Sequence, residues 1–92
     1  MREKIIEHKL LMEVKKIGGL ALKFVSPGFD GVPDRIVLLH GGKIGFVEVK
    51  SPGEKPRQLQ LARHRLLNQL GFTTMQKYDP VRHPIKSRRY EL

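Results

Sequence analysis

The chain has 92 residues, of which 18 are Lys or Arg and 9 are Asp or Glu, so its formal net charge is +9. This length has room for one small domain over residues 1–92, and the charge favours a polyanionic partner such as nucleic acid. The lack of cysteine excludes disulfides, zinc–thiolate sites and a thiol nucleophile. No apolar stretch is long enough to cross a bilayer and the N-terminus lacks the pattern of a secretory signal, so we expect no membrane association and a cytoplasmic location.

The N-terminal part of the chain predicts a helix followed by a short strand. Residues 3–17 predict an amphipathic helix, because apolar side chains recur at helical spacing: Ile6, Leu10, Val14 and Ile17. Gly18 and Gly19 then end the helix. Residues 20–25 predict a strand, and the Pro- and Gly-rich residues 26–33 predict a loop.

The rest of the chain predicts a hairpin, a second helix and a last strand. Residues 35–39 and 44–50 are β-branched and apolar runs on either side of a Gly-Gly turn. A second helix is expected over residues 56–70 and a final strand over 72–75, ahead of an irregular or partly ordered basic tail over 77–92. The predicted buried side of the second helix consists of Leu59, Ala62, Leu66 and Leu70. The resulting αβββαβ order predicts an α+β domain, a small central mixed sheet flanked by helices.

Two acids and a lysine fall on the predicted hairpin. Asp34 lies at the start of its first strand, and Glu48 and Lys50 lie on its second strand, where alternation puts both on one face. A strict two-residue turn would pair Asp34 with Val49 and direct the Asp34 carboxylate to the opposite face. We therefore predict a three-residue turn or a bulge that sets Asp34 opposite Glu48 or Lys50.

With that register, the hairpin predicts a metal site. The carboxylates of Asp34 and Glu48 would converge, and oxygen ligands are what Mg²⁺ or Mn²⁺ requires, with the main-chain carbonyl of Val49 as a third ligand. A metal ion lowers the pKa of a bound water, and Lys50 could orient that water or stabilise the charge on a phosphate oxygen. The pattern is typical of phosphodiester hydrolysis.

These motifs together resemble the virus-type replication-repair nuclease (VRR-NUC) branch of the PD-(D/E)XK superfamily, which has a restriction-endonuclease-like core. The resemblance covers the helix over residues 3–17, then residues 18–28, Gly31–Arg35, Phe46–Gly53 and Leu59-Gln60. It implies a metal-dependent nuclease in which Asp34 and Glu48 bind the metal and Lys50 is the catalytic lysine. It also implies that a glutamate of the first helix and a glutamine of the second complete the site.

The helix-one acid and the helix-two glutamine each leave a choice. Position within the family favours Glu7 over Glu3, although a surface glutamate paired with a lysine is the ordinary reading of such a residue. The spacing to Gly71 favours Gln60 over Gln58, and a glutamine on an exposed helix flank is ordinarily just solvated.

Several cations are candidates for DNA contacts. They are Lys15, Lys16, Lys55, Arg57 and Arg63. Arg63 lies within the predicted apolar stripe, so it either reaches a phosphate or extends along the surface to solvent. The four histidines show no metal-ligand spacing, and we expect all four on the surface.

The sequence thus predicts a Mg²⁺- or Mn²⁺-dependent endonuclease acting on branched DNA such as a four-way junction. Small stand-alone members of the family resemble junction resolvases that work as homodimers, and a domain of this size needs a second copy to cut two strands. The alternatives are a flap or general DNA nuclease and a non-catalytic basic module that binds nucleic acid. The resemblance favours a role in DNA repair or in a phage replication module.

Overall fold

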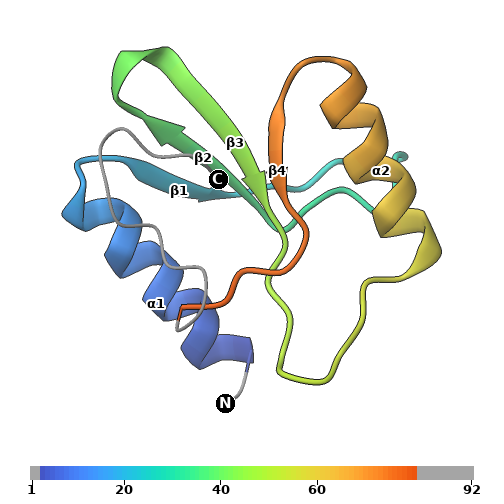
Figure 1. The fold of residues 1–92 in the computed structure, drawn as a ribbon, viewed down its shortest axis with the longest axis horizontal. Coiled ribbons are helices and arrows are strands. Elements are labelled where there is room, and N and C mark those ends of the chain that lie inside the picture. Colours follow the sequence, from blue (N-terminus) through green and yellow to red (C-terminus); the bar gives the residue numbers. More distant parts are fainter. Residues whose placement is uncertain (1–2, 81–92) are drawn as a thin grey trace.

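The structure, a computed structural model, describes residues 3–80 of the chain. Within this range the elements are α1 (Glu3–Lys16), β1 (Leu20–Lys23), β2 (Arg35–Leu39), the 3₁₀ turn η1 (His40–Gly42), β3 (Lys43–Val47), α2 (Gln58–Gln69) and β4 (Thr73–Met75). This order confirms the predicted α+β class (Figure 1). Neither α1 nor α2 is long and apolar enough to span a bilayer.

The four strands form one mixed sheet in the order β1-β2-β3-β4. The β1/β2 and β2/β3 pairs are antiparallel, whereas β3 and β4 are parallel. A parallel neighbour requires a crossover connection, and α2 supplies it. The sheet fans out between the two helices, with α1 below β1 and α2 beside β4 (Figure 1). This confirms the predicted small mixed sheet flanked by helices.

The hairpin register is the predicted one. Arg35 pairs with Val47 and Leu39 with Lys43, so three residues, His40–Gly42, make the turn. Gly41 and Gly42 have φ of +79° and +72°, in the left-handed region that favours glycine. Continuing this register one step beyond Arg35 and Val47 sets Asp34 opposite Glu48.

The core lies between α1 and one face of the sheet. The predicted stripe of α1 is buried against strand residues and a residue that follows β4: the cluster is Ile6, Leu10, Val14, Ile17, Val37, Val47, Val49 and Tyr78. Tyr78 is 1% exposed, although the sequence places it in the basic tail. The packed part of the chain therefore reaches at least this residue, and the tail beyond Pro80 lies outside the described residues.

Two predicted strands are too long. The first ends at Lys23 instead of Val25, and the second ends at Val47, so Glu48, Val49 and Lys50 follow β3 rather than lying in it. The physical reason lies in β2, the partner of both strands, because Pro33, two residues before β2, has no N–H with which to extend the ladder. Glu48 is not part of the ladder with β2, but its main-chain N–H donates to the carbonyl of Met75 in β4.

The predicted buried side of the second helix is wrong. Leu59, Leu66 and Leu70 are 43%, 37% and 65% exposed, while Gln60 and His64 are buried. Ala62 is half-buried. The helix turns its polar residues inward, because Gln60 binds an acid of the site described below. His64, 0% exposed, also contradicts the expectation that every histidine is on the surface.

Candidate active site

Asp34 and Glu48 meet at one end of the hairpin. Asp34 directly precedes β2 and Glu48 directly follows β3, and the two strands are antiparallel. The main-chain N–H of Val49 donates to Asp34 Oδ2 at 2.9 Å, and the N–H of Phe24 donates to the Asp34 carbonyl at 2.8 Å. The structure thus brings together the two acids that the sequence singles out.

The main chain of Glu48 is held on both sides. Its N–H donates to the carbonyl of Met75 at 2.9 Å, and its carbonyl accepts a hydrogen bond from the N–H of Tyr78 at 3.0 Å. The end of β4 and the residues after it therefore fix where the Glu48 side chain starts. Sequence reasoning did not predict that Tyr78 supports Glu48. The signal that the sequence offers is an aromatic residue inside a basic stretch.

Glu48 is 1% exposed, and only one of its two carboxylate oxygens has a hydrogen-bond partner in residues 3–80. Its Oε2 accepts from Gln60 Nε2 at 3.2 Å and lies 3.4 Å from Lys50 Nζ. Its Oε1 is buried and has no hydrogen-bond partner within residues 3–80. A buried acceptor without a donor is costly, so this oxygen calls for a proton shared with Asp34 or for a bound cation.

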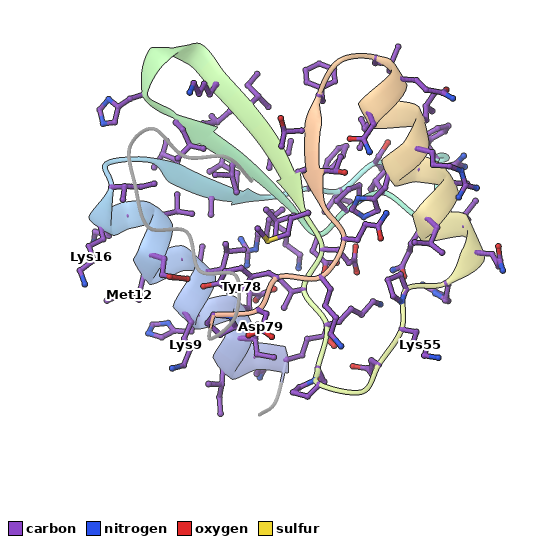
Figure 2. The ribbon with its side chains drawn as sticks, viewed as in Figure 1. Lys9, Met12, Lys16, Lys55, Tyr78 and Asp79 are labelled. Carbon is purple, nitrogen blue, oxygen red and sulfur yellow. The ribbon has the colours of Figure 1, made fainter. Side chains whose placement is uncertain are left out.

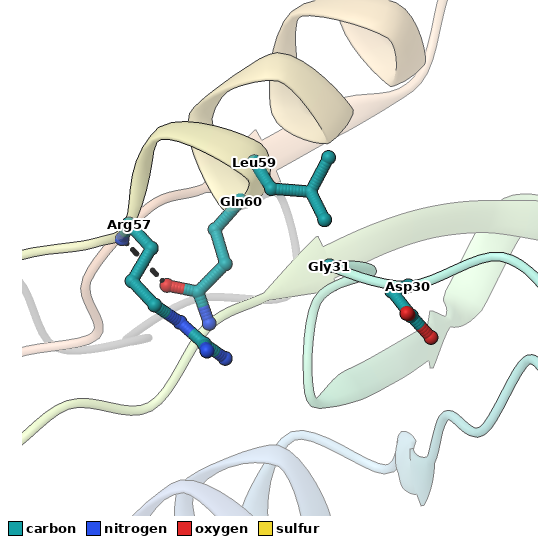
Figure 3. A pocket seen from close by; sticks show the side chains of 5 residues that line it. All are labelled: Asp30, Gly31, Arg57, Leu59 and Gln60. Atoms are coloured by element: carbon teal, nitrogen blue, oxygen red, sulfur yellow. Dashed lines mark hydrogen bonds between the residues drawn. The ribbon is translucent and has the colours of Figure 1, made fainter.

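Gln60 is oriented from the start of α2. Its Oε1 accepts from the main-chain N–H of Arg57 at 2.9 Å (Figure 3). This bond turns its amide nitrogen toward Glu48. Gln58, the other candidate, is exposed. Of the two glutamines, the structure brings Gln60 to the acids.

The electrostatics of Glu48 fit a cation. Burial, and then the charge of Asp34, raise the pKa of the Glu48 carboxyl to about 7, and Lys50 opposes this rise. A divalent ion between two such carboxylates would offset their repulsion and supply the missing partner of Oε1. No group of three or more His, Cys, Asp or Glu side chains in residues 3–80 could hold a metal. A bound ion would therefore complete its shell with water and a main-chain carbonyl such as that of Val49, as Mg²⁺ commonly does.

The two helix-one acids have different surroundings. Glu7 Oε1 lies 3.1 Å from Arg35 Nη2, so its charge is paired with the residue next to Asp34. The pKa of Glu3 is raised, first by loss of solvation and then by the charges of Glu54 and Asp34, while Lys50 opposes the rise. The charges of Asp34 and Lys50 thus contribute to the pKa of Glu3, whereas Glu7 contacts Arg35.

The five candidate DNA-contacting cations do not form one patch. Lys15 and Lys16 end α1, the opposite end from Glu3, about 20 Å away at 1.5 Å per residue. Lys16 and Lys55 lie on opposite sides of the view in Figure 2. Arg57 is exposed and lines a pocket together with Gln60, which bonds to Glu48.

Arg63 joins α2 to the loop that leads to Asp34. Its Nε donates to the carbonyl of Asp30 at 2.7 Å, and its guanidinium lies 3.8 Å from the centre of the Phe29 ring. Gly31 approaches α2 so closely that a Cβ there would lie 2.7 Å from Leu59 Cγ. These contacts fix the loop, and beside them a pocket of about 420 Å³ opens between Asp30, Gly31, Arg57, Leu59 and Gln60 (Figure 3).

His64 gives a stability prediction. Both of its ring nitrogens are buried without a hydrogen-bond partner in the described part of the chain, and burial lowers its pKa. Because the pKa of His64 is lower in the folded state than the unfolded value of 6.5, the unfolded chain binds the proton first. The free energy of unfolding is therefore highest above pH 6.5 and falls as the pH drops below it. His64→Leu should therefore raise the free energy of unfolding, by about 1 kcal/mol at pH 8 and by more at pH 5.5. Urea titrations at both pH values measure this.

The matched control is His8→Leu, because His8 is exposed on α1. It should leave the pH dependence of unfolding unchanged. An equal change in both variants would contradict the role given to His64.

Comparisons with known proteins agree with this geometry. No protein-family model matches the chain. It is 61% identical over 71 residues to "Putative nuclease p44" of Acyrthosiphon pisum secondary endosymbiont phage 1, and the match covers 77% of this chain and 76% of that protein. A solved structure described as "VRR_NUC domain" is similar with a TM-score of 0.77 and 32% sequence identity, over 82% of each chain. Both likenesses span most of the two chains compared.

Proposed function

The chain belongs to the VRR-NUC family of nucleases, and on this premise we propose that it is a Mg²⁺- or Mn²⁺-dependent endonuclease that hydrolyses the phosphodiester bonds of branched DNA as a homodimer. The observation that carries the proposal is the Glu48 carboxylate. It is buried, it faces Asp34, and its Oε1 has no partner in residues 3–80.

The residues of the site divide the work. Asp34 and Glu48 would hold the ion, with the Val49 carbonyl as a further ligand, and the ion would supply an activated water and a counter-charge for the phosphate. Lys50 would orient the attacking water and stabilise negative charge on the phosphate, and the 3.4 Å distance from its Nζ to Glu48 Oε2 supports this role. Gln60 holds the Glu48 carboxylate in place by its 3.2 Å hydrogen bond.

For the helix-one acid, the surroundings support Glu3 more directly than Glu7. Glu3 interacts electrostatically with Asp34 and Lys50, so it could bind a water of the ion's shell. Glu7 would act through Arg35, whose side chain it holds at 3.1 Å. In this proposal Glu7 orients the side chain of Arg35, the residue next to Asp34.

Arg57 and Lys55 are the cations we assign to the DNA backbone near the cut. They precede α2, and the pocket beside Gln60 is lined by Arg57. The net charge of +9 supports a DNA substrate, because phosphate contacts by Lys and Arg dominate such affinity. The similar phage protein is named a nuclease, and on that basis we propose that this chain acts in phage DNA replication or repair in the host cytoplasm.

The test is strand cleavage of labelled four-way junction, flap and linear duplex with Mg²⁺, Mn²⁺ or EDTA. The wild type should cut the junction in either metal and not in EDTA. Asp34→Ala should lose at least about 100-fold in cleavage rate, because one of two carboxylate ligands is gone, yet still bind the junction.

The matched control is Asp30→Ala, which removes an acid from the same loop without touching Glu48. Cleavage in EDTA would contradict metal dependence, and full activity of Asp34→Ala would contradict the site. Faster cutting of the flap would mean that the enzyme selects flaps instead of junctions, and equal cutting of linear duplex would mean that it is a general DNA nuclease. Binding without any cleavage by the wild type would favour the non-catalytic module.

A further inference from the structure

Helix α2 contacts the segments that carry both acids of the site. Gln60, in its first turn, donates from Nε2 to Glu48 Oε2 at 3.2 Å. Arg63, one turn later, donates from Nε to the carbonyl of Asp30 at 2.7 Å, four residues before Asp34. Residues three apart are neighbours on one side of a helix. A single rigid element therefore reaches both sides of the site.

The loop that precedes Asp34 packs closely on α2. We call residues 26–33 the Asp34 loop. The Arg63 guanidinium lies 3.8 Å from the centre of the Phe29 ring, a cation–π distance. A Cβ on Gly31 would lie 2.7 Å from Leu59 Cγ and 3.3 Å from the Leu59 carbonyl carbon. Figure 3 shows the Leu59 side chain above the loop at this point. The loop and the helix thus meet with no room for a side chain between them.

The two acids have a physical reason to separate when no cation is bound. Burial and then the charge of Asp34 raise the pKa of Glu48, so keeping both carboxylates ionised side by side costs free energy. Asp34 Oδ2 accepts from the main-chain N–H of Val49 at 2.9 Å, and a loose Asp34 loop would let this carboxylate turn away. Ligands that are already in place bind an ion more tightly than ligands that must first be ordered.

We propose that Arg63 and Gly31 are positioning residues of the metal site. They dock the Asp34 loop on the helix that also holds Glu48, and so keep the two carboxylates together for the ion. The inference rests on the metal site of the proposed function. It assigns Arg63 to the loop instead of a DNA phosphate, because its Nε and its guanidinium plane are both engaged within the chain.

The first test compares two glycines of the Asp34 loop. Gly28 and Gly31 have φ of +80° and +85°, so alanine strains the backbone similarly at either position. A Cβ at Gly28 would meet nothing within 4 Å, whereas one at Gly31 would clash with Leu59. Calorimetric titration with Mn²⁺ should therefore show a dissociation constant raised about 10-fold in Gly31→Ala and less than about 2-fold in Gly28→Ala.

A second substitution should rescue the first. In the double variant Gly31→Ala/Leu59→Ala, the side-chain atoms that the new Cβ would meet are gone. Its Mn²⁺ dissociation constant should return to within about 3-fold of the wild-type value, and Leu59→Ala alone should stay close to the wild type. Failure of this rescue would contradict the docking of the loop on α2.

Arg63→Met tests the other contact. It should raise the Mn²⁺ dissociation constant about 10-fold, the usual effect of losing a group that orients a metal ligand. Its DNA dissociation constant, measured in EDTA, should change no more than that of Arg65→Met, which removes an exposed cation from the same helix. Weaker DNA binding than in Arg65→Met, with unchanged Mn²⁺ affinity, would mean that Arg63 binds a phosphate and would overturn its assignment to the loop.

A metal-free measurement separates this inference from the proposed function. Because the Val49 N–H donates to Asp34 Oδ2, its hydrogen exchange in EDTA reports the position of Asp34. Exchange should be at least about 10-fold faster than in the wild type in Gly31→Ala and Arg63→Met. The amide of Val37, which is 0% exposed in β2, should keep its wild-type rate if the variant is folded. If Gly31→Ala fails this check, Arg63→Met still carries the test.

Unchanged exchange at Val49 in the folded variants would overturn the proposal, as would equal Mn²⁺ affinities of Gly28→Ala and Gly31→Ala. A wild type that binds no Mn²⁺ would contradict the metal site of the proposed function. In that case the Val49 amide still decides whether α2 sets the position of Asp34.

Discussion

Lys50→Met should lower the rate of strand cleavage about 100- to 1000-fold, the usual effect of removing a group that stabilises charge in the transition state. Methionine keeps an unbranched stem of similar length, so the packing beside Glu48 should change little. Because Lys50 is not a metal ligand in the proposed site, the thermal shift caused by Mn²⁺ should persist. Single-turnover cleavage and thermal unfolding with and without Mn²⁺ measure the two effects.

The matched control for this variant is Lys9→Met, which removes the same charge from the outer side of α1 (Figure 2). Its effect should be limited to slightly weaker DNA binding, and added salt should remove this difference from the wild type. Cleavage near the wild-type rate in Lys50→Met would exclude a catalytic role for this lysine. A comparable loss in Lys9→Met would mean that the effect is one of net charge.

The register of the hairpin could be deduced from the sequence because alternation is a strict rule. A shift of one residue swaps the faces of a strand, so only a three-residue turn or a bulge brings Asp34 to the face of Glu48. The observed turn over His40–Gly42 follows from that requirement. A different rule, helical periodicity, predicted the α1 stripe, where Ile6, Leu10 and Val14 are buried as expected.

The inward side of α2 could not be deduced in this way. Leucine spacing predicted that Leu59, Leu66 and Leu70 face the core, yet they are exposed, and Gln60 and His64 are buried. Hydrophobic periodicity indicates which residues are buried, but a functional site can require a polar residue inside. In this helix Gln60 lies on the inner side, where it bonds to Glu48, and the leucines on the other side are exposed.

Contacts between distant segments were also beyond sequence reasoning. Arg63 was predicted as a DNA contact because it is cationic, but the sequence does not show that its Nε donates to the carbonyl of Asp30, 33 positions earlier. Tyr78 reads as part of a basic tail, whereas its N–H holds the carbonyl of Glu48. Local patterns hold no information on such pairs, which form only once the sheet is assembled.

Glu48→Gln should have the largest effect of any change in the site. The amide has nearly the shape of the carboxylate but no charge to bind the ion, so cleavage should fall at least about 1000-fold and the thermal shift with Mn²⁺ should disappear. Without metal, by contrast, Glu48→Gln should raise the free energy of unfolding at pH 8. The folded pKa of Glu48 is raised from 4.5 to about 7, so the acid favours the folded state below pH 4.5 and loses this contribution as pH rises through 7.

Urea unfolding in EDTA at pH 5 and pH 8 separates the two states of this residue. The wild type should lose stability between these values through Glu48, while its His64 gains in the same range, so the comparison with Glu48→Gln isolates the acid. The variant should be more stable than the wild type at pH 8, and Mg²⁺ should stabilise the wild type more at pH 8 than at pH 5. Retained cleavage, or an identical pH dependence of unfolding, would contradict the metal site. A site that destabilises the metal-free domain and is relieved by its ion would explain why a protein of net charge +9 buries an acid next to another acid.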